Sequence, residues 1–359
     1  MSRDMRTQKR RTKYQQLVEK LGTSIRSGEL QPGDRLPSFQ EMQRLHGAAT
    51  ATMQRVYAEL EQQHLIERRN GSGIYVADAR AQKSHVIGVL ARIGPNWNHP
   101  YHHRSMSAFF QCATENRYET LMLNPTSSIA WERMDGVVNL HSDTYRFEDK
   151  LPPLMPFVSL IVPVRGQCSV ILDESGGVRQ LVEHLLELGH RRIAILLPDH
   201  GYSLAARLTG YQNALQQAGI VPAPQWQRTL YNDNSANYSE YGYLTMRQWL
   251  REDWQQTGCT ALITQNDDTA IGAIRALREQ GIDVPGDVSV TGFDGTEIGL
   301  HIDPALTTVS IPLEQAGKAA FDLLMQQINS GEITPQTITL ETQIFERAST
   351  APAKTNVEI

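Results

Sequence analysis

The chain lacks any run of about 18 apolar residues, and its first residues, MSRDMRTQKRRTKYQQ, are basic and polar. A membrane-spanning helix or an export signal needs an apolar stretch, so the sequence predicts a cytoplasmic protein with no membrane partner. Cysteine is also scarce: Cys112, Cys168 and Cys259 are odd in number and far apart, with no Cys-x-x-Cys pair. This spacing argues against a disulfide framework or a cysteine-ligated metal, and we expect three buried thiols.

Motifs that carry common enzyme chemistry are missing as well. The sequence has no Walker phosphate loop, Gly-x-Ser-x-Gly elbow, His-Glu-x-x-His pair or paired-carboxylate motif. His99, His102 and His103 lie close together, but their neighbours supply no acidic or cysteine ligand in a typical arrangement. We therefore expect no enzymatic activity, no cofactor and no metal site.

The net charge of −5 is unevenly distributed. Residues 1–80 hold 14 Lys and Arg against 9 Asp and Glu, whereas the remainder holds 20 against 30. A basic module on an acidic body is typical of a protein that binds a polyanion at one end, although a merely solvated charged surface would give the same count. At 359 residues with 40% apolar side chains, the chain can build two or three cores.

The first eighty residues predict three helices and a hairpin. Apolar residues recur at helical spacing over 14–25, and Ser38 with Glu41 forms a capping box for a short second helix that ends at Gly47. A third helix follows over about 50–63. Two helices joined by a tight turn predict a helix-turn-helix.

The hairpin that follows is expected to form a wing. Residues 65–68 and 74–76 have the composition of short strands, and Asn70-Gly71-Ser72-Gly73 suits a tight turn because glycine accepts a positive φ. Arg68 and Arg69 lead into this turn, where they can meet phosphates or a narrow minor groove. A Gly-rich hairpin beside arginines is often an ordinary exposed turn, but the order helix, capped helix, turn, helix and wing is far more specific.

The stretch from IRSGELQPGDR through LPSFQEMQRLHGAATATMQRVYAELEQQHLIERRNGSGIYV resembles the winged-helix DNA-binding domain of the GntR family of bacterial transcription regulators. The resemblance covers about residues 12–77. In that family the serine after Leu-Pro, an arginine two places on, an arginine at the start of the recognition helix and the wing glycine lie against DNA. The resemblance places these roles at Ser38, Gln40, Thr50, Gly71, Ser72 and Gly73.

Gln40 and Thr50 stand where the family has arginine, which reads guanine bidentately and discriminates by ~1–3 kcal/mol. Glutamine can pair with adenine, and threonine can touch a thymine methyl or a phosphate. One hypothesis is therefore a shift toward A·T-rich readout, and the other is weak DNA binding. The remaining DNA-binding candidates are Thr52, Gln54, Arg55, Arg68 and Arg69.

Beyond a polar linker at 78–84, short apolar runs alternate with amphipathic segments. Strands are predicted at 86–90, 120–123, 136–138, 158–162, 193–197, 261–264 and 288–292, and helices at about 103–117, 175–188, 207–218, 238–254, 269–280 and 313–329. This alternation predicts an α/β body of doubly wound parallel sheets, whose ligands lie beyond the carboxyl ends of the strands.

The body resembles the effector-binding domain of the LacI/GalR regulators, a fold shared with periplasmic sugar-binding proteins. The stretches that carry the resemblance are LVEHLLELGHRRIAIL, ARLTGYQNALQQAGI, ITQNDDTAIGAIRALREQGIDVPGDVSVTGFDG and DPALTTVSIPLEQAGKAAFDLL. It implies a DNA-binding domain at 1–77, a linker at 78–84 and a two-lobed body at 85–350. The chain is expected to cross between the two lobes three times, near 171–174, 300–304 and 329–335. Lobe 1 then comprises about 85–171 and 304–329, and lobe 2 about 174–300 and 335–350.

Ligand binds between the lobes in that family, where the arginine of Arg-Leu-x-Gly-Tyr and the aspartate of Asn-Asp meet ligand hydroxyls. The resemblance places these roles at Arg207 and Asp267. A carboxylate can accept two vicinal hydroxyls and a guanidinium fork can donate to hydroxyl or carboxylate oxygens. From the residues alone, Asp267 could equally be the N-cap of the helix at 269–280, and Arg207 a surface charge.

Further ligand candidates are named for their position near predicted strand ends. Aromatic rings there can stack on a sugar face, although about half of them could instead pack between helices. The candidates are Trp97, Tyr101, Tyr202, Tyr231 and Phe293, with Asn98, Asn232 and Asp233 as polar additions.

These features together predict a ligand-responsive bacterial transcription regulator with the hybrid layout of arabinose-type repressors, acting as a repressor by family habit. The expected partners are double-stranded operator DNA, a sugar-like effector and a second copy of the chain in a homodimer. A degenerate regulator that senses a sugar but scarcely binds DNA stays open, because Gln40 and Thr50 replace the family's arginines.

Overall fold

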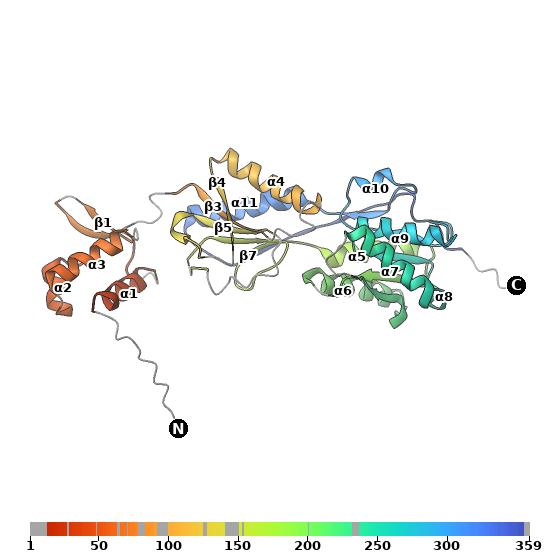
Figure 1. The fold of residues 1–359 in the computed structure, drawn as a ribbon, viewed down its shortest axis with the longest axis horizontal. Helices are drawn as coiled ribbons and strands as arrows, with labels where there is room; N and C mark the ends of the chain where they lie inside the picture. The colour runs from red at the N-terminus through yellow and green to blue at the C-terminus, as the bar shows by residue number, and fades with distance from the viewer. Residues whose placement is uncertain are drawn as a thin grey trace, which may run out of the picture.

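A computed structural model describes residues 13–26, 29–47, 49–62, 65–69, 71–77, 83–91, 100–124, 128–140, 151–152, 154–199, 201–231 and 237–354. Figure 1 shows a small helical domain with a hairpin followed along the long axis by two α/β lobes. The small domain has its own apolar core, whereas the largest core continues from the first lobe into the second. The fold class predicted from the sequence is confirmed.

The small domain has the element order expected for a winged helix-turn-helix. Ser38 caps the second helix in a complete capping box with Glu41, and Gly47 ends it with a φ of 56°. On the third helix, Met53, Val56 and Leu60 are fully buried, so the opposite side of this helix faces solvent. The elements are α1 (Lys13–Arg26), α2 (Phe39–His46), α3 (Thr50–Gln62), and the antiparallel strands β1 (Ile66–Arg69) and β2 (Gly73–Val76).

The first lobe is built on a six-stranded parallel sheet with the order β4-β3-β5-β6-β7-β13. Helices α4 (Pro100–Glu115) and α11 (Leu313–Ser330) pack against each other over one face. The other face carries a smaller apolar cluster that includes Trp131 of η1 (Trp131–Arg133). The strands are β3 (Val86–Ala91), β4 (Glu119–Leu123), β5 (Gly136–Leu140), β6 (Phe157–Leu160), β7 (Cys168–Leu172) and β13 (Thr337–Leu340).

The second lobe repeats this plan on a parallel sheet with the order β9-β8-β10-β11. Alternate residues of β8 point to opposite cores: Ile193 packs with α5 and α6, and Ala194 packs with α7 and α9. The strands are β8 (Ile193–Leu197), β9 (Gln227–Thr229), β10 (Ala261–Thr264) and β11 (Ser289–Thr291). The helices are α5 (Glu174–Glu187), α6 (Tyr202–Gln217), η3 (Pro224–Trp226), α7 (Tyr238–Glu252), α8 (Trp254–Thr257), α9 (Asp267–Glu279) and α10 (Ile298–His301).

The strand order has a functional consequence. In each lobe the strand that comes first in the chain lies between the second and the third, so the order reverses at β3 and β5 and again at β8 and β10. In open α/β sheets, ligands bind at such a switch point, beyond the carboxyl ends of the strands. A ligand site is therefore expected beyond the carboxyl ends of β8 and β10.

Two of the three predicted crossovers are wrong. The first lies at Asp173, between β7 and α5, within the predicted 171–174. The second follows β12 (Thr308–Ser310), not 300–304, and the third lies between β13 and β14 (Gln343–Phe345), not at 329–335. Because β13 pairs with β7, it belongs to the first lobe although it falls in the span predicted for the second. β12 and β14 pair with each other as an antiparallel ribbon, so the two later crossovers lie side by side at its end.

The remaining differences are small and have local causes. α6 begins at Tyr202, five residues earlier than predicted, and β7, β9 and β12 to β14 were not predicted as strands. Most of these strands have only three or four residues, too few to show a period of two. Cys168 and Cys259 are buried as expected, whereas Cys112 is half-buried. Within the described ranges, none of the helices has the length and apolar character required to cross a bilayer.

Candidate effector site and DNA-binding surface

Two of the predicted ligand residues meet at the switch point of the second lobe. Asp267 follows β10 closely as the first residue of α9, and Arg207 lies on α6, which follows β8. β8 and β10 are paired neighbours. Nη1 of Arg207 donates to the backbone oxygen of Gln265, directly after β10, so this guanidinium joins α6 to the end of β10.

Arg207 is held on three sides. Its Nε donates to Oε2 of Glu174 at 2.6 Å, and the two side chains are only 7% and 4% exposed. Its Cζ lies 3.9 Å from the centroid of the Phe293 ring. Together with the bond to Gln265, these contacts fix the plane of the guanidinium. The alternative that Arg207 is a surface charge is therefore wrong.

Asp267 is fully buried and well satisfied by hydroxyl and amide donors. Its Oδ2 accepts from the backbone nitrogen of Thr296 at 2.6 Å and from the Thr296 hydroxyl at 2.7 Å, and its Oδ1 accepts from the Thr308 hydroxyl at 2.5 Å. The alternative that Asp267 caps α9 is wrong, because Asn266 is the N-cap and accepts from the backbone nitrogen of Thr269. A carboxylate has about four acceptor positions, so contact with a ligand hydroxyl stays a prediction.

The burial of Asp267 predicts a pH-dependent stability. Burial raises the pKa of this carboxyl to about 6, although the two threonines pull it down. Because the folded pKa exceeds the unfolded value of about 3.9, the folded state is destabilised as pH rises through this interval, by roughly 2–3 kcal/mol in total. We expect the difference in free energy of unfolding between wild type and Asp267→Asn to change by this amount between about pH 4 and pH 6, measured by urea denaturation. A constant difference across this range would contradict the buried titration.

The other ligand candidates differ in their surroundings. Phe293 is fully buried beneath Arg207, so it packs in the core and offers no face to a sugar. Tyr202 is half-buried in the first turn of α6, and burial together with the charge of Glu174 raises its pKa. Tyr231 is 48% exposed, with its ring 6.4 Å from that of Tyr241. The candidates Trp97, Asn98, Asn232 and Asp233, and the side chain of Tyr101, lie outside the described residues.

Sequence reasoning missed several polar residues of this cluster. Glu174 is buried in the first turn of α5, and Asp294 is buried after β11 with a φ of 103°. Burial raises the pKa of Asp294 well above its usual range, while the charge of Arg207 lowers it. Glu174 comes directly after the strand β7 and its crossover, and this position beyond a strand end could have singled it out.

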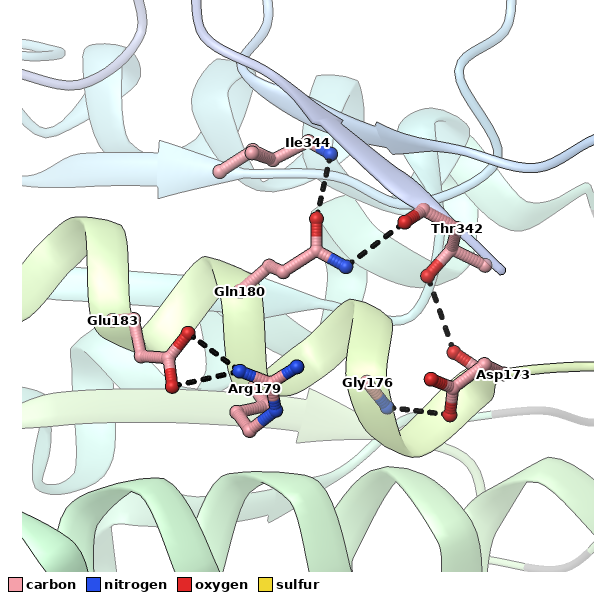
Figure 2. A network of polar contacts seen from close by, with 7 residues as sticks. All are labelled: Asp173, Gly176, Arg179, Gln180, Glu183, Thr342 and Ile344. Carbon is pink, nitrogen blue, oxygen red and sulfur yellow. Dashed lines mark hydrogen bonds and ion pairs between the residues drawn. The ribbon is translucent and has the colours of Figure 1, made fainter.

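The crossovers between the two lobes, which together form the hinge, contact the same helix that carries Glu174. Figure 2 shows Gln180 of α5 facing the third crossover, where its amide donates to the backbone oxygen of Thr342 at 2.9 Å and accepts from the backbone nitrogen of Ile344 at 3.0 Å. The Thr342 hydroxyl donates to the backbone oxygen of Asp173 at 3.2 Å, so the first and third crossovers are linked as well. The first half of α5 therefore carries both Glu174 of the candidate effector site and the contacts to the hinge.

Replacing Gln180 with leucine is expected to destabilise the hinge. The change leaves the backbone groups of Thr342 and Ile344 without this partner, which costs about 1–3 kcal/mol when such groups are partly buried. Glu183→Gln on the same helix is the matched control, because its pair with Arg179 is half-exposed and such pairs contribute about 0–1 kcal/mol. Urea denaturation of both variants measures the difference, and equal losses would show that Gln180 has no special role.

The predicted base-reading side chains lie on exposed parts of α2 and α3. Gln40, Thr50 and Gln54 are exposed and uncharged, and Thr52 is half-buried. The Thr50 hydroxyl lies 3.4 Å from Oε1 of Gln43, so the start of α3 adjoins α2. Ser38 is exposed, but its hydroxyl also accepts from the backbone nitrogen of Glu41 to cap α2.

The wing arginines are engaged in weak surface pairs. Arg68 lies 3.0 Å from Glu61 and Arg69 lies 2.7 Å from Glu67, with each side chain about half exposed. Surface pairs of this kind contribute about 0–1 kcal/mol, so phosphates can replace the carboxylates at little cost. At the tip, Gly71 and Gly73 have φ of 74° and 129°. Ser72 and Tyr75 share a hydrogen bond of 2.7 Å between their hydroxyls, and Arg55 lies over the Tyr14 ring.

Comparisons with known families agree with this division of the chain. Residues 13–76 match the bacterial regulatory proteins of the gntR family, and residues 182–350 match a periplasmic binding protein-like domain. The first match covers α1 to β2, and the second covers most of the second lobe together with the later crossovers.

Individual relatives are transcription regulators. The chain is 32% identical over 233 residues to the HTH-type transcriptional regulator CelR of Thermobifida fusca, covering 62% of this chain and 65% of that one. It is 23% identical to the arabinose metabolism transcriptional repressor of Geobacillus stearothermophilus over 89% of this chain and 92% of the other. Three further curated regulators are matched over only about half of their own length.

A solved structure shares the fold of the body. The LacI family transcriptional regulator of Enterococcus faecium with bound ribose aligns with a TM-score of 0.63 and 26% identity, over 75% of this chain and 100% of that one. The resemblance stated from the sequence, a GntR-type domain followed by a LacI-type effector domain, is confirmed.

Proposed function

This chain joins a gntR-type helix-turn-helix domain to a periplasmic binding protein-like domain, and from that layout we propose a ligand-responsive transcription regulator, acting as a repressor. The observation that carries the proposal is the presence of two separate sites in one chain. An exposed helix-turn-helix face lies at one end, and a buried Arg207 and Asp267 cluster lies at a sheet switch point in the other. The proposal places the protein in the cytoplasm, without catalytic activity.

The winged-helix domain is proposed to contact both the base edges and the phosphate backbone of DNA. Gln40, Thr50 and Gln54 read base edges, with adenine and thymine favoured because no arginine fork is available on these positions. Arg55, Arg68 and Arg69 supply phosphate affinity, and the glycines of the wing tip let the backbone approach a groove.

The two-lobed body is proposed to bind a sugar as its effector. One relative's name refers to arabinose metabolism, and ribose is bound in the Enterococcus faecium structure. In this chain Arg207 would donate to ligand hydroxyls and Asp267 would accept from one. Tyr202 and Tyr231 follow the carboxyl ends of β8 and β9, and they are proposed to line the entrance to the sugar site.

A homodimer is proposed because a two-fold operator requires two winged helices. Exposed apolar side chains are candidates for its interface in both lobes: Leu121 and Met122 on β4, and Ile298 and Leu300 on α10. β4 and α10 both lie along the upper side of the body in Figure 1. A second copy could therefore cover both patches at once.

Coupling is proposed to run through the first lobe. Asp135 accepts from the backbone nitrogen and hydroxyl of Ser84, at 2.7 and 2.8 Å, and from the backbone nitrogen of His85 at 3.0 Å. Lys83 donates to Asn329 of α11 at 2.6 Å. Residues 83–85, which lead into β3, are thus fixed to the first lobe, and a change of lobe orientation on effector binding is proposed to reposition the winged helices.

The proposal is tested by sequencing the genomic fragments that the purified chain retains at moderate salt, with and without a pool of monosaccharides. Enrichment of a palindromic, A·T-containing site that changes with the sugar pool is the expected result. Fragments without any common sequence, in either condition, would leave a sugar-sensing protein that scarcely binds DNA as the better description.

A further inference from the structure

The ion pair between Glu174 and Arg207 carries a consequence for the charge of the effector. Nε of Arg207 and Oε2 of Glu174 are 2.6 Å apart, and both side chains are buried. A guanidinium that already faces a carboxylate at this distance forms a pair with no net charge. Arg207 therefore reaches the effector site as a fixed hydrogen-bond donor, and its positive charge is largely cancelled.

The surrounding buried groups are acidic. Among the residues that the structure describes, the buried carboxyl groups are those of Glu174, Asp267 and Asp294, and Arg207 is the one buried guanidinium. These groups lie close enough to interact, because the charges of the other three all act on the Asp294 carboxyl. The first turn of α9 is acidic as well, with Asp267 and Asp268 at the helix end that would otherwise attract an anion.

An anionic effector would meet an unfavourable site. A phosphate or carboxylate needs at least one charge-assisted donor that is not already neutralised, and a bidentate arginine is the usual choice. A neutral polyhydroxy compound needs only donors and acceptors, and those are what a paired guanidinium and buried carboxyls supply. The protein thus separates the donor function of Arg207 from its charge.

We propose that Glu174 is the specificity-determining residue for effector charge: by neutralising Arg207 it admits an uncharged sugar and rejects its phosphorylated or carboxylated counterpart. This inference rests on the proposed effector site at Arg207. It predicts that removing the charge of the Glu174 carboxylate, without any change at Arg207, raises the affinity of the site for anions.

The remaining contacts of Arg207 are expected to hold the guanidinium in place when Glu174 is replaced. The stacking on Phe293 and the bond to the Gln265 backbone oxygen do not involve Glu174. Glutamine has nearly the shape of glutamate, and its side-chain oxygen can still accept from Nε. In Glu174→Gln the guanidinium is therefore expected to stay in place while its charge is no longer cancelled.

The test titrates the full chain with ribose, arabinose, ribose 5-phosphate and inorganic phosphate by calorimetry, in wild type, Glu174→Gln and the control Glu183→Gln. Glu183 is on the same helix, but its carboxylate pairs with Arg179 at the surface. We expect wild type to bind the phosphates weakly or not at all. Glu174→Gln is expected to gain roughly 10- to 100-fold in affinity for ribose 5-phosphate and phosphate, as expected for removing one charge about 6–12 Å from the bound anion at an effective dielectric near 20.

Two results would overturn the inference: a wild-type protein that binds ribose 5-phosphate more tightly than ribose, or a Glu174→Gln variant whose phosphate affinity rises no more than that of the control. Asp267→Asn, which removes another carboxylate from the cluster, provides a second variant with the same expected direction if Glu174→Gln does not fold. Mobility-shift assays on the same preparations report on DNA binding separately. Specific DNA binding with unchanged phosphate affinity would reject the role of Glu174 and leave the regulator proposal intact.

Discussion

Replacing Arg207 with alanine is expected to abolish the effector response and to lower the free energy of unfolding by about 3–5 kcal/mol, because it breaks a buried ion pair by removing one partner. Glu174 would remain buried, near enough to Asp294 to interact with it, without the cation that now balances it. The effector would lose its fixed guanidinium donor in the same step. Urea denaturation measures the first effect, and calorimetric titration with ribose and arabinose measures the second.

A double variant separates the two effects. Arg207→Met combined with Glu174→Met removes both charges and keeps the volume, and replacing a buried ion pair by apolar residues is often neutral in stability. We expect this variant to unfold near the wild-type midpoint, to bind DNA and to ignore the effector. If it bound the sugar with wild-type affinity, the effector site would have to lie elsewhere.

The second large effect is expected on the DNA-binding face. Changing Gln40, Thr50 and Gln54 to alanine together should lower affinity for the enriched site by about 100-fold or more, since good base contacts discriminate by ~1–3 kcal/mol each. Affinity for an unrelated duplex at low salt should change little, because Arg55, Arg68 and Arg69 remain. Mobility-shift titrations with both duplexes at two salt concentrations measure the ratio of the affinity for the enriched site to the affinity for the unrelated duplex.

Gln16→Ala on the exposed surface of α1 is the control for this variant and should leave the ratio unchanged. A complementary change is Gln40→Arg with Thr50→Arg, which introduces the residues of the GntR pattern. We expect the enriched sequence to move toward guanine-containing sites. An identical loss of affinity for specific and unrelated duplexes in the alanine variant would show that these side chains do not read bases.

Much of the fold could be predicted because the local signals agree with the tertiary structure. The capping box at Ser38 and Glu41, the glycine at 47 and the glycine-rich wing each specify a local conformation that the structure contains. In the body, buried parallel strands form continuous apolar runs separated by amphipathic helices, which identifies a doubly wound sheet. Local chemistry is sufficient at these places because each element is defined by its own residues.

The hinge and the polar cluster could not be predicted in the same way. β12, β13 and β14 are three or four residues long, and their assignment depends on which strand they pair with. The role of Glu174 depends on Arg207, which is 33 positions away in the chain. Thr296 and Thr308 donate hydrogen bonds to Asp267, and neither threonine has a sequence signal that points to this contact. Long-range pairing decides these features.

The measurement to make is the affinity of the purified chain for its enriched DNA fragment, by fluorescence anisotropy, with increasing concentrations of the sugar that alters fragment retention. Wild type is expected to change its DNA affinity by about 5- to 150-fold at saturating sugar, the usual range of coupling between two sites. Arg207→Met with Glu174→Met should show the same DNA affinity at every sugar concentration. A wild-type protein that binds the sugar in calorimetry but keeps one DNA affinity throughout would contradict the proposal that the two sites form one regulator.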